Sequence, residues 1–201
     1  MLTIVLKRYT LLCCLSIAIA APTSNGNDYC HPSRETKIAR YDDLPFVEPG
    51  PNPIPPHYYG LSYTTFQVDQ YDGFIPPTSG TQWTMAFGGS GNISVPDSPP
   101  KQTFDLHSFS YACVSGVPQA ECAISAWGWK PGGRVIKRII IFPRLDPGHV
   151  IEDFKMNKTS FTREWQGLKS VGFSIARSDN GGDMYGGLAL DDVKYTIKTD
   201  C

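Results

Sequence analysis

Leu168-Lys169-Ser170-Val171-Gly172-Phe173-Ser174-Ile175-Ala176 is the stretch that decides the fold of this 201-residue chain. Its apolar residues Val171, Phe173 and Ile175 alternate with residues that are small or polar. In a strand, successive side chains point to opposite faces, so this alternation predicts one apolar face and one small, polar face. We therefore expect a β-strand that packs on a core with one side only.

The rest of the chain from Tyr58 onward has a similar texture. Short runs of aromatic and β-branched residues are separated by Gly, Pro, Asn and Asp, and no convincing amphipathic helix appears, which predicts an all-β domain. Gln82 to Phe87 alternates as the first stretch does. Arg134 to Phe142 ends in four consecutive apolar residues, which favours a strand buried on both faces at the centre of the core over a helix.

Three predicted strands change phase partway along. The apolar residues move from one side to the other within residues 61–68, 104–113 and 188–197. One extra residue reverses the faces of a strand, so each step indicates a β-bulge or a strand that passes between two sheets. Roughly eight to ten such strands are most economically arranged as a β-sandwich of jelly-roll type.

The N-terminal part divides into a leader and an extension. Residues 1–20 combine Lys7 and Arg8, an apolar run over 11–19 and the small-residue exit Ala18-Ile19-Ala20, a pattern typical of a secretory signal peptide. Residues 21–56 are polar and then proline-rich, and we expect them to form an extension that wraps the outside of a sandwich at 57–201. The sequence thus predicts a soluble, secreted, extracellular protein.

Cysteine usage fits that compartment. Cys13 and Cys14 would leave with the leader, and the four that remain are Cys30, Cys113, Cys122 and Cys201. An even number in an oxidising compartment predicts two disulfides, for which three pairings are possible. We favour a Cys113–Cys122 bridge that staples a hairpin and a Cys30–Cys201 bridge that ties the two ends together. A zinc site is disfavoured because no C-x-x-C pair is present.

Two sequons and the charge balance add to this picture. Asn92-Ile93-Ser94 and Asn157-Lys158-Thr159 predict N-glycosylation at solvent-facing positions. Without Lys7 and Arg8 the chain keeps 16 basic and 19 acidic residues, a net charge of −3, which disfavours nucleic acid or an anionic membrane as partner. The size fits a single domain, which we expect to be monomeric.

Motifs for catalysis are missing. The sequence contains no G-x-S-x-G elbow, no H-E-x-x-H and no P-loop, so we expect the protein not to be an enzyme. A glycosidase needs two carboxylates beside a cleft, and the residues that could in principle supply them are Glu121, Glu152, Asp153 and Glu164.

A metal site is possible in one loop. Asp179, Asn180 and Asp183 offer hard oxygen ligands among glycines, which would suit a structural calcium ion, although the spacing is not that of an EF-hand. A plain polar turn explains the same residues and is the favoured alternative. Apart from this calcium, no cofactor is predicted.

Aromatic residues are the best candidates for ligand contact. Trp127 and Trp129 stand two apart on one predicted strand and therefore share a face, and Tyr58 and Tyr59 add aromatic rings near the proline-rich entry. Flat rings beside polar groups suit both sugars and protein partners. Burial of the two tryptophans in the core is the favoured alternative, since sandwiches normally bury a tryptophan.

The order of features from Phe104 to Ile197 resembles secreted jelly-roll modules of the galactose-binding-like and carbohydrate-binding-module type, particularly in fungal proteins. The resemblance covers about half of the mature chain and rests on Phe104-Asp105-Leu106, Gly128-Trp129, Pro131-Gly132-Gly133, Phe161, Trp165 and Leu190-Asp191-Asp192-Val193. In size, leader, cysteines and sequons the chain is also similar to small secreted effectors of plant-associated fungi.

These likenesses imply a non-catalytic, effector-like recognition protein. Its partner would be a host extracellular protein or a cell-wall component, and inhibition of a host secreted protease is one specific form of that hypothesis. Rigid loops held by disulfides would lose little entropy on binding. The alternatives are a carbohydrate-binding or lectin-like protein, and a glycan-active enzyme.

Overall fold

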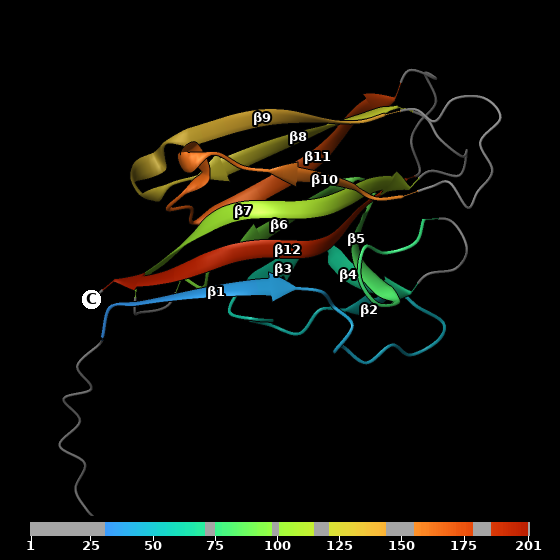
Figure 1. Ribbon diagram of the computed structural model, residues 1–201, viewed down its shortest axis with the longest axis horizontal. Coiled ribbons are helices and arrows are strands. Elements are labelled where there is room, and N and C mark those ends of the chain that lie inside the picture. The colour runs from blue at the N-terminus through green and yellow to red at the C-terminus, as the bar shows by residue number, and fades with distance from the viewer. Residues whose placement is uncertain are drawn as a thin grey trace, which may run out of the picture.

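Two antiparallel sheets face each other in the computed structural model, which describes residues 31–70, 75–97, 101–114, 121–143, 155–178 and 186–200 (Figure 1). Within these residues one sheet contains, in spatial order, β10 (Asn157–Ser160), β7 (Lys101–Val114), β12 (Gly187–Asp200), β5 (Gln82–Phe87), β4 (Phe66–Gln70) and β2 (Asn52–Pro53), with β1 (Ser33–Ala39) also paired to β12. The other contains β3 (Ser62–Thr64), β6 (Ser90–Ser94), β11 (Ser170–Ser178), β8 (Cys122–Trp129) and β9 (Val135–Phe142). The predicted all-β sandwich is confirmed.

The core lies between the inner faces of the two sheets. Val171 and Phe173 of β11 are 0% and 3% exposed, so the apolar face predicted for this strand does point inward. The Phe173 ring meets Phe66 of β4 and Phe109 of β7 across the core, with centroids 6.2 and 5.5 Å apart. These edge-to-face contacts join the two layers through β11, the middle strand of its sheet.

The predicted changes of phase are all present. In residues 61–68 the chain passes from β3 in one sheet to β4 in the other, turning at Thr65, which has φ 65°. The pairing of β7 with β12 shifts register between Asp191 and Tyr195, which confirms the irregularity expected in both strands. On the other side of β12, pairing passes from β5 to β1 at the same place.

The prediction for the strand that ends in four apolar residues was wrong. β9 lies at the edge of its sheet, not at the centre of the core. Ile140 and Phe142 are buried, but Val135, Ile139 and Ile141 point outward and are 48%, 59% and 47% exposed. A continuous apolar run therefore arose here from one buried face and one exposed apolar face.

The extension predicted at 21–56 is not separate from the sandwich. β1 pairs along seven residues of β12, and Tyr41 is fully buried in the core. Within the described residues, β1 continues the pairing on the side of β12 where β5 ends, so the sandwich includes residues before 57. Residues 1–30 lie outside the described part, and within the described residues no helix is long and apolar enough to cross a membrane.

A disulfide joins Cys113 to Cys122, as predicted, with Cα atoms 6.5 Å apart. It does not staple a hairpin, however, because β7 and β8 belong to opposite sheets. The bridge therefore fastens the two layers together. Cys30 and Cys201 lie outside the described residues, so their bridge remains a prediction.

Candidate functional site

Trp127 and Trp129 lie on the outer face of the five-stranded sheet. Their neighbours in β8, Ile124 and Ala126, are fully buried and face the core, so the alternation of the strand turns both indoles away from it. Trp127 is partly exposed and Trp129 is 37% exposed. Burial of the pair in the core, the alternative favoured from sequence, is therefore wrong. Among the described residues, the buried tryptophans are Trp83 and Trp165.

Gly172 of β11 forms the floor beside these rings. It pairs with Trp127, and a Cβ atom placed on it would lie 2.8 Å from Cζ3 of Trp129. The Trp129 ring therefore leans over the glycine, a position that any larger residue would obstruct. Ser170 and Ser174 lie on the same small, polar face of the strand, which the sequence predicted, but they do not line the space beside the rings.

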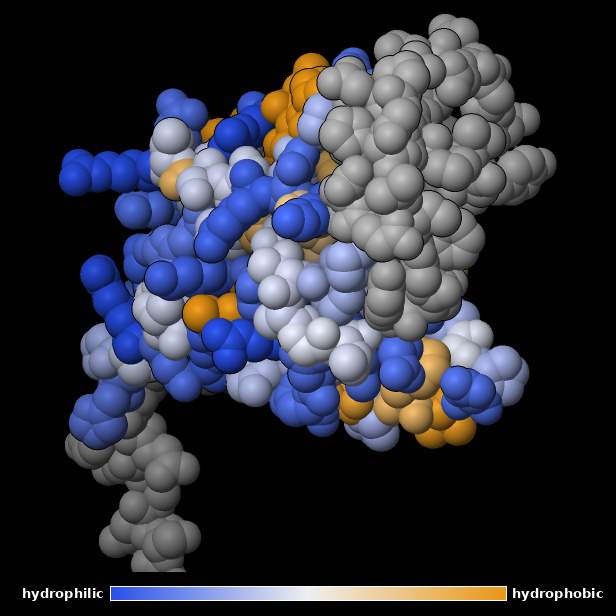
Figure 2. All heavy atoms as spheres, turned by 45° about the vertical axis from the view of Figure 1, so that its right-hand side comes forward, coloured by the Kyte–Doolittle hydropathy of each residue, from blue (hydrophilic) through white to orange (hydrophobic). Residues whose placement is uncertain are grey.

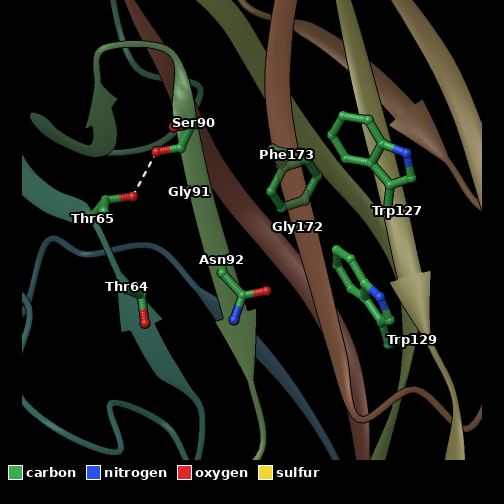
Figure 3. Close-up of a pocket in the computed structure, with 9 residues that line it drawn as sticks. All are labelled: Thr64, Thr65, Ser90, Gly91, Asn92, Trp127, Trp129, Gly172 and Phe173. Atoms are coloured by element: carbon green, nitrogen blue, oxygen red, sulfur yellow. Dashed lines mark hydrogen bonds between the residues drawn. The ribbon is translucent and has the colours of Figure 1, made fainter. Parts of the chain in front are cut away.

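The far wall comes from β6 and the turn after β3. Asn92 pairs with Gly172 on one side and with Thr64 on the other. These three residues therefore form one row across three neighbouring strands. Thr65 donates its hydroxyl to the backbone carbonyl of Ser90 over 2.6 Å, which holds the turn against β6. Figure 3 shows Asn92 between Thr64 and the two tryptophans.

Together these residues line a groove of about 330 Å³ that is open to solvent. Two strand spacings separate β8 from β6, which gives roughly 10 Å between the tryptophan wall and the asparagine wall. Among the described residues that line it, none is charged: the groove presents indole faces, hydroxyls, one side-chain amide and backbone. It can therefore stack a flat apolar surface and hydrogen-bond neutral polar groups beside it.

Lys137 and the exposed face of β9 border the groove. The ammonium group of Lys137 lies 5.4 Å from the centre of the Trp127 ring, within range of a cation–π contact. Beyond it, Figure 2 shows hydrophobic side chains gathered along the edge of the molecule where β9 runs, in agreement with the exposure of Ile139 and Ile141. The contact supports the Trp127 ring from outside the groove.

Tyr58 and Tyr59 are not brought together with the tryptophans. Tyr58 is 7% exposed, stacks on Tyr41, and donates its hydroxyl to Asp43 over 2.6 Å. Burial, followed by the neighbouring Asp43 carboxylate, raises the pKa of the Tyr58 phenol well above its ordinary value. Its ring offers no free face to a ligand, so the prediction for Tyr58 is corrected. Tyr59 is 42% exposed but does not line the groove.

The other predicted site residues are scattered. Asp179, Asn180 and Asp183 lie outside the described residues, so the calcium site remains a prediction. The two sequons lie in different sheets: Asn157 begins β10 at an edge of the seven-stranded sheet, whereas Asn92 lies inside the groove.

Sequence reasoning missed most of the polar wall. Thr64, Thr65 and Ser90 carry no motif, and they meet the tryptophans only because β3 and β6 pair next to β11. Gly172 did carry a signal, since it lies on the small face of a strand whose other face is apolar. A small face on a central strand leaves room for larger side chains of neighbouring strands to lean across it.

No family model matches the sequence, and no curated protein matches it. Among solved structures it is similar to an exo-β-agarase (TM-score 0.40, 9% identity, 82% of this chain and 25% of that chain). It is also similar to the Clostridium thermocellum xylanase 10B CBM22-1–GH10 modules complexed with xylohexaose (0.35, 9%, 71% and 26%) and to TmCBM61 complexed with β-1,4-galactotriose (0.33, 10%, 75% and 100%). The chain spans about a quarter of the agarase and xylanase chains. At TM-scores of 0.40 or lower these likenesses do not bear on function, which is inferred below from the groove itself.

Proposed function

We propose that the protein binds a neutral carbohydrate in the groove and does so without catalysis. The observation that carries this proposal is the placement of Trp127 and Trp129 side by side on an outer sheet face, above the glycine floor and opposite Asn92. This function is the carbohydrate-binding alternative of the sequence analysis, which the geometry supports better than a protease inhibitor or other protein-binding effector.

Sugar rings have the two kinds of surface that the groove offers partners for. Their C–H faces are apolar and pack on indole, and their rims carry hydroxyls that need donors and acceptors. Asn92 supplies both a donor and an acceptor, and the hydroxyl of Thr64 adds another of each. A width of roughly 10 Å between the walls suits a single chain of rings lying along the sheet.

The neutral lining favours an uncharged glycan. A uronic acid or sulfate would lose hydration on entering the groove and gain no cationic partner from the residues that line it. Lys137 contacts the Trp127 ring, but it is not among the residues that line the groove. The groove should therefore discriminate against acidic polysaccharides.

The chemistry of the groove lining also supports binding without turnover. Glycoside hydrolysis needs two carboxylates beside the scissile bond, and the described lining contains neither Asp nor Glu. Glu121 and Glu164 are exposed and do not line the groove, while Glu152 and Asp153 lie outside the described residues.

The protein-binding hypothesis has lost some of its support. It relied in part on Tyr58 as a contact residue, but Tyr58 is 7% exposed and lies inside the protein. Secretion and an extracellular, effector-like role remain predictions. Both are compatible with a carbohydrate ligand that belongs to a cell wall.

Affinity electrophoresis tests the proposal. The full chain, made in the bacterial periplasm so that the disulfide forms without N-glycosylation, is run through gels that contain neutral or acidic soluble polysaccharides. We expect at least one neutral polysaccharide to retard it, and Trp127→Ala and Trp129→Ala to weaken that binding about tenfold or more, the equivalent of about 1.4 kcal/mol.

Phe87→Ala is the matched control, because Phe87 is a 44% exposed aromatic residue on the other sheet. It should bind as the wild type does. No retardation by any neutral polysaccharide, or an equal loss in all three variants, would overturn the proposed function.

A further inference from the structure

We propose that Asn92 is a glycosylation switch within the groove: an N-glycan on its amide lies on Trp129 and closes the groove to other carbohydrates. This inference rests on the proposed function for its consequence, although the modification and the shielding of the tryptophan can be measured without it.

The position of Asn92 is unusual for an acceptor. It lies in the middle of β6, which pairs with β11 on one side and β3 on the other, rather than on a loop. The next residue, Ile93, is 1% exposed and faces the core, so the alternation of the strand sends Asn92 to the outer face. Any group attached to its amide must therefore leave through the groove.

The Asn92 amide and the Trp129 indole both lie close to Gly172. A Cβ atom placed on Gly172 would lie 3.7 Å from Oδ1 of Asn92 and 2.8 Å from Trp129, so both side chains approach the same small residue from opposite sides. Figure 3 shows the Asn92 side chain on the groove side of β6, with Oδ1 turned toward β11 and Trp129 and with Nδ2, which would carry the glycan, on the same amide. The first sugar of an attached glycan would begin beside the ring that the proposed function assigns to sugar stacking.

The local sequence fulfils the requirements of the acceptor. Ser94 supplies the hydroxyl of the Asn-X-Ser sequon, and the middle residue, Ile93, is not proline. Transfer forms a C–N bond between Nδ2 of Asn92 and the anomeric carbon of an oligosaccharide carried on a lipid diphosphate. The C–O bond to the diphosphate breaks, the diphosphate leaves with that electron pair, and the amide loses one proton to base.

The two occupants need the same place. A sugar that leaves Asn92 toward Trp129 lies between the asparagine and tryptophan walls, roughly 10 Å apart, where a ring of a second chain would have to stack. An attached glycan also competes at a high effective concentration, since it cannot diffuse away. Modified molecules should therefore be closed and unmodified molecules open.

The second sequon offers an internal comparison. Asn157 pairs with Tyr111 at an edge of the seven-stranded sheet and does not line the groove. A glycan there should leave both the tryptophans and the groove untouched. Asn157→Gln is therefore the matched control for loss of a glycan.

The test uses the full chain secreted from a yeast as wild type, Ser94→Ala and Asn157→Gln. Ser94→Ala removes the acceptor signal but keeps the Asn92 amide, whereas enzymatic deglycosylation would convert it to a charged aspartate. Peptide mass spectrometry measures occupancy at Asn92, acrylamide quenching measures the exposure of the tryptophans, and gel retardation measures binding.

We expect Asn92 to be occupied in the wild type. Acrylamide quenching should then be about half that of Ser94→Ala, because Trp83 and Trp165 are buried and the accessible emission comes from the groove pair. Retardation by neutral polysaccharide should be about tenfold weaker in the wild type than in Ser94→Ala. Asn157→Gln should match the wild type in both readouts.

Other outcomes overturn the proposal. The proposal fails if Asn92 carries no glycan, whether or not Asn157 carries one. It also fails if Asn92 carries a glycan but acrylamide quenches the wild type as strongly as Ser94→Ala. If no form binds any polysaccharide, the proposed function fails, and the quenching difference alone then decides whether the glycan covers Trp129.

Discussion

Trp129 lies across Gly172 of the neighbouring strand, so that a methyl group in place of the glycine hydrogen would come within 2.8 Å of the indole. The φ angle of Gly172 is not positive, so another residue could adopt its backbone conformation. A glycine is needed here because a side chain would not fit. The shape of the groove therefore depends on one missing side chain.

Gly172→Ala should weaken carbohydrate binding about tenfold while changing the free energy of unfolding by less than about 1 kcal/mol. The clash is with the far end of a partly exposed side chain, so Trp129 moves and the core does not. Affinity electrophoresis and urea unfolding measure the two effects. Ser174→Ala, on the same face of β11, is the control, and equal binding by both variants would contradict the prediction.

Two neighbouring residues of β9 test which face of this strand is buried. Ile140 is 4% exposed and faces the core, whereas Ile139 is 59% exposed on the outer face. Ile140→Ala should lower the free energy of unfolding by about 2–5 kcal/mol, and Ile139→Ala by about 0.5 kcal/mol or less. Equal losses, measured by urea unfolding, would mean that β9 is covered on both faces.

Local sequence patterns predicted which residues share a face of a strand, but not which strands lie next to each other in a sheet. The alternation in residues 168–176 correctly gave β11 an apolar and a small face, and the spacing of Trp127 and Trp129 correctly put them on one side. Which side faces solvent depends on the rest of the sheet. The same limit explains β9, where an apolar run was compatible with a central strand as well as with an exposed edge.

The groove itself arises from long-range register. Asn92 and Trp127 are both paired with Gly172, although the sequence separates the three residues widely. No periodicity within one strand contains that information, which is why Asn92 could be recognised as a sequon but not as part of a site. Likewise, Cys113 and Cys122 were paired correctly while their strands were assigned to one hairpin instead of two sheets.

Removal of the Cys113–Cys122 disulfide should destabilise the sandwich by about 2–3 kcal/mol, the loop-closure entropy expected for a bridge across about ten residues. The double variant Cys113→Ala/Cys122→Ala, compared with wild type by urea unfolding, measures this. Carbohydrate binding should persist, because neither cysteine lines the groove. A loss seen only in binding would contradict a purely structural role.

The register of β1 on β12 bears on the other predicted bridge. Ser33 pairs with Thr199, which places the described neighbours of Cys30 and Cys201 at the same end of the sheet. Non-reducing peptide mapping should therefore find Cys30 linked to Cys201 as well as Cys113 linked to Cys122. Either cysteine of the first pair in its free thiol form would contradict the prediction.

Asp191 should make the stability of the fold depend on pH. Its carboxylate is fully buried and accepts the backbone N–H groups of Ser79 and Asp192 over 2.8 and 2.7 Å. Burial raises the pKa of this carboxyl group to about 6 and outweighs those two hydrogen bonds, which lower it. The folded state therefore holds the proton more tightly than the unfolded chain, whose pKa is about 3.9.

Because the pKa is raised on folding, the contribution of Asp191 to stability is complete below about pH 4 and is lost as the pH rises through about 6. A shift of about two units corresponds to about 3 kcal/mol at most. Asp191→Asn cannot ionise, so the free energy of unfolding of the wild type minus that of this variant should fall between pH 4 and pH 7.5. Asp192→Asn loses the Arg40 contact at 3.3 Å and one charge that raises the Asp191 pKa, but burial is the larger cause, so this variant should keep most of the fall seen in the wild type. A difference that stays flat would mean that folding leaves the pKa of Asp191 unchanged, and a difference that rises with pH would mean that its carboxylate is stabilised in the charged form.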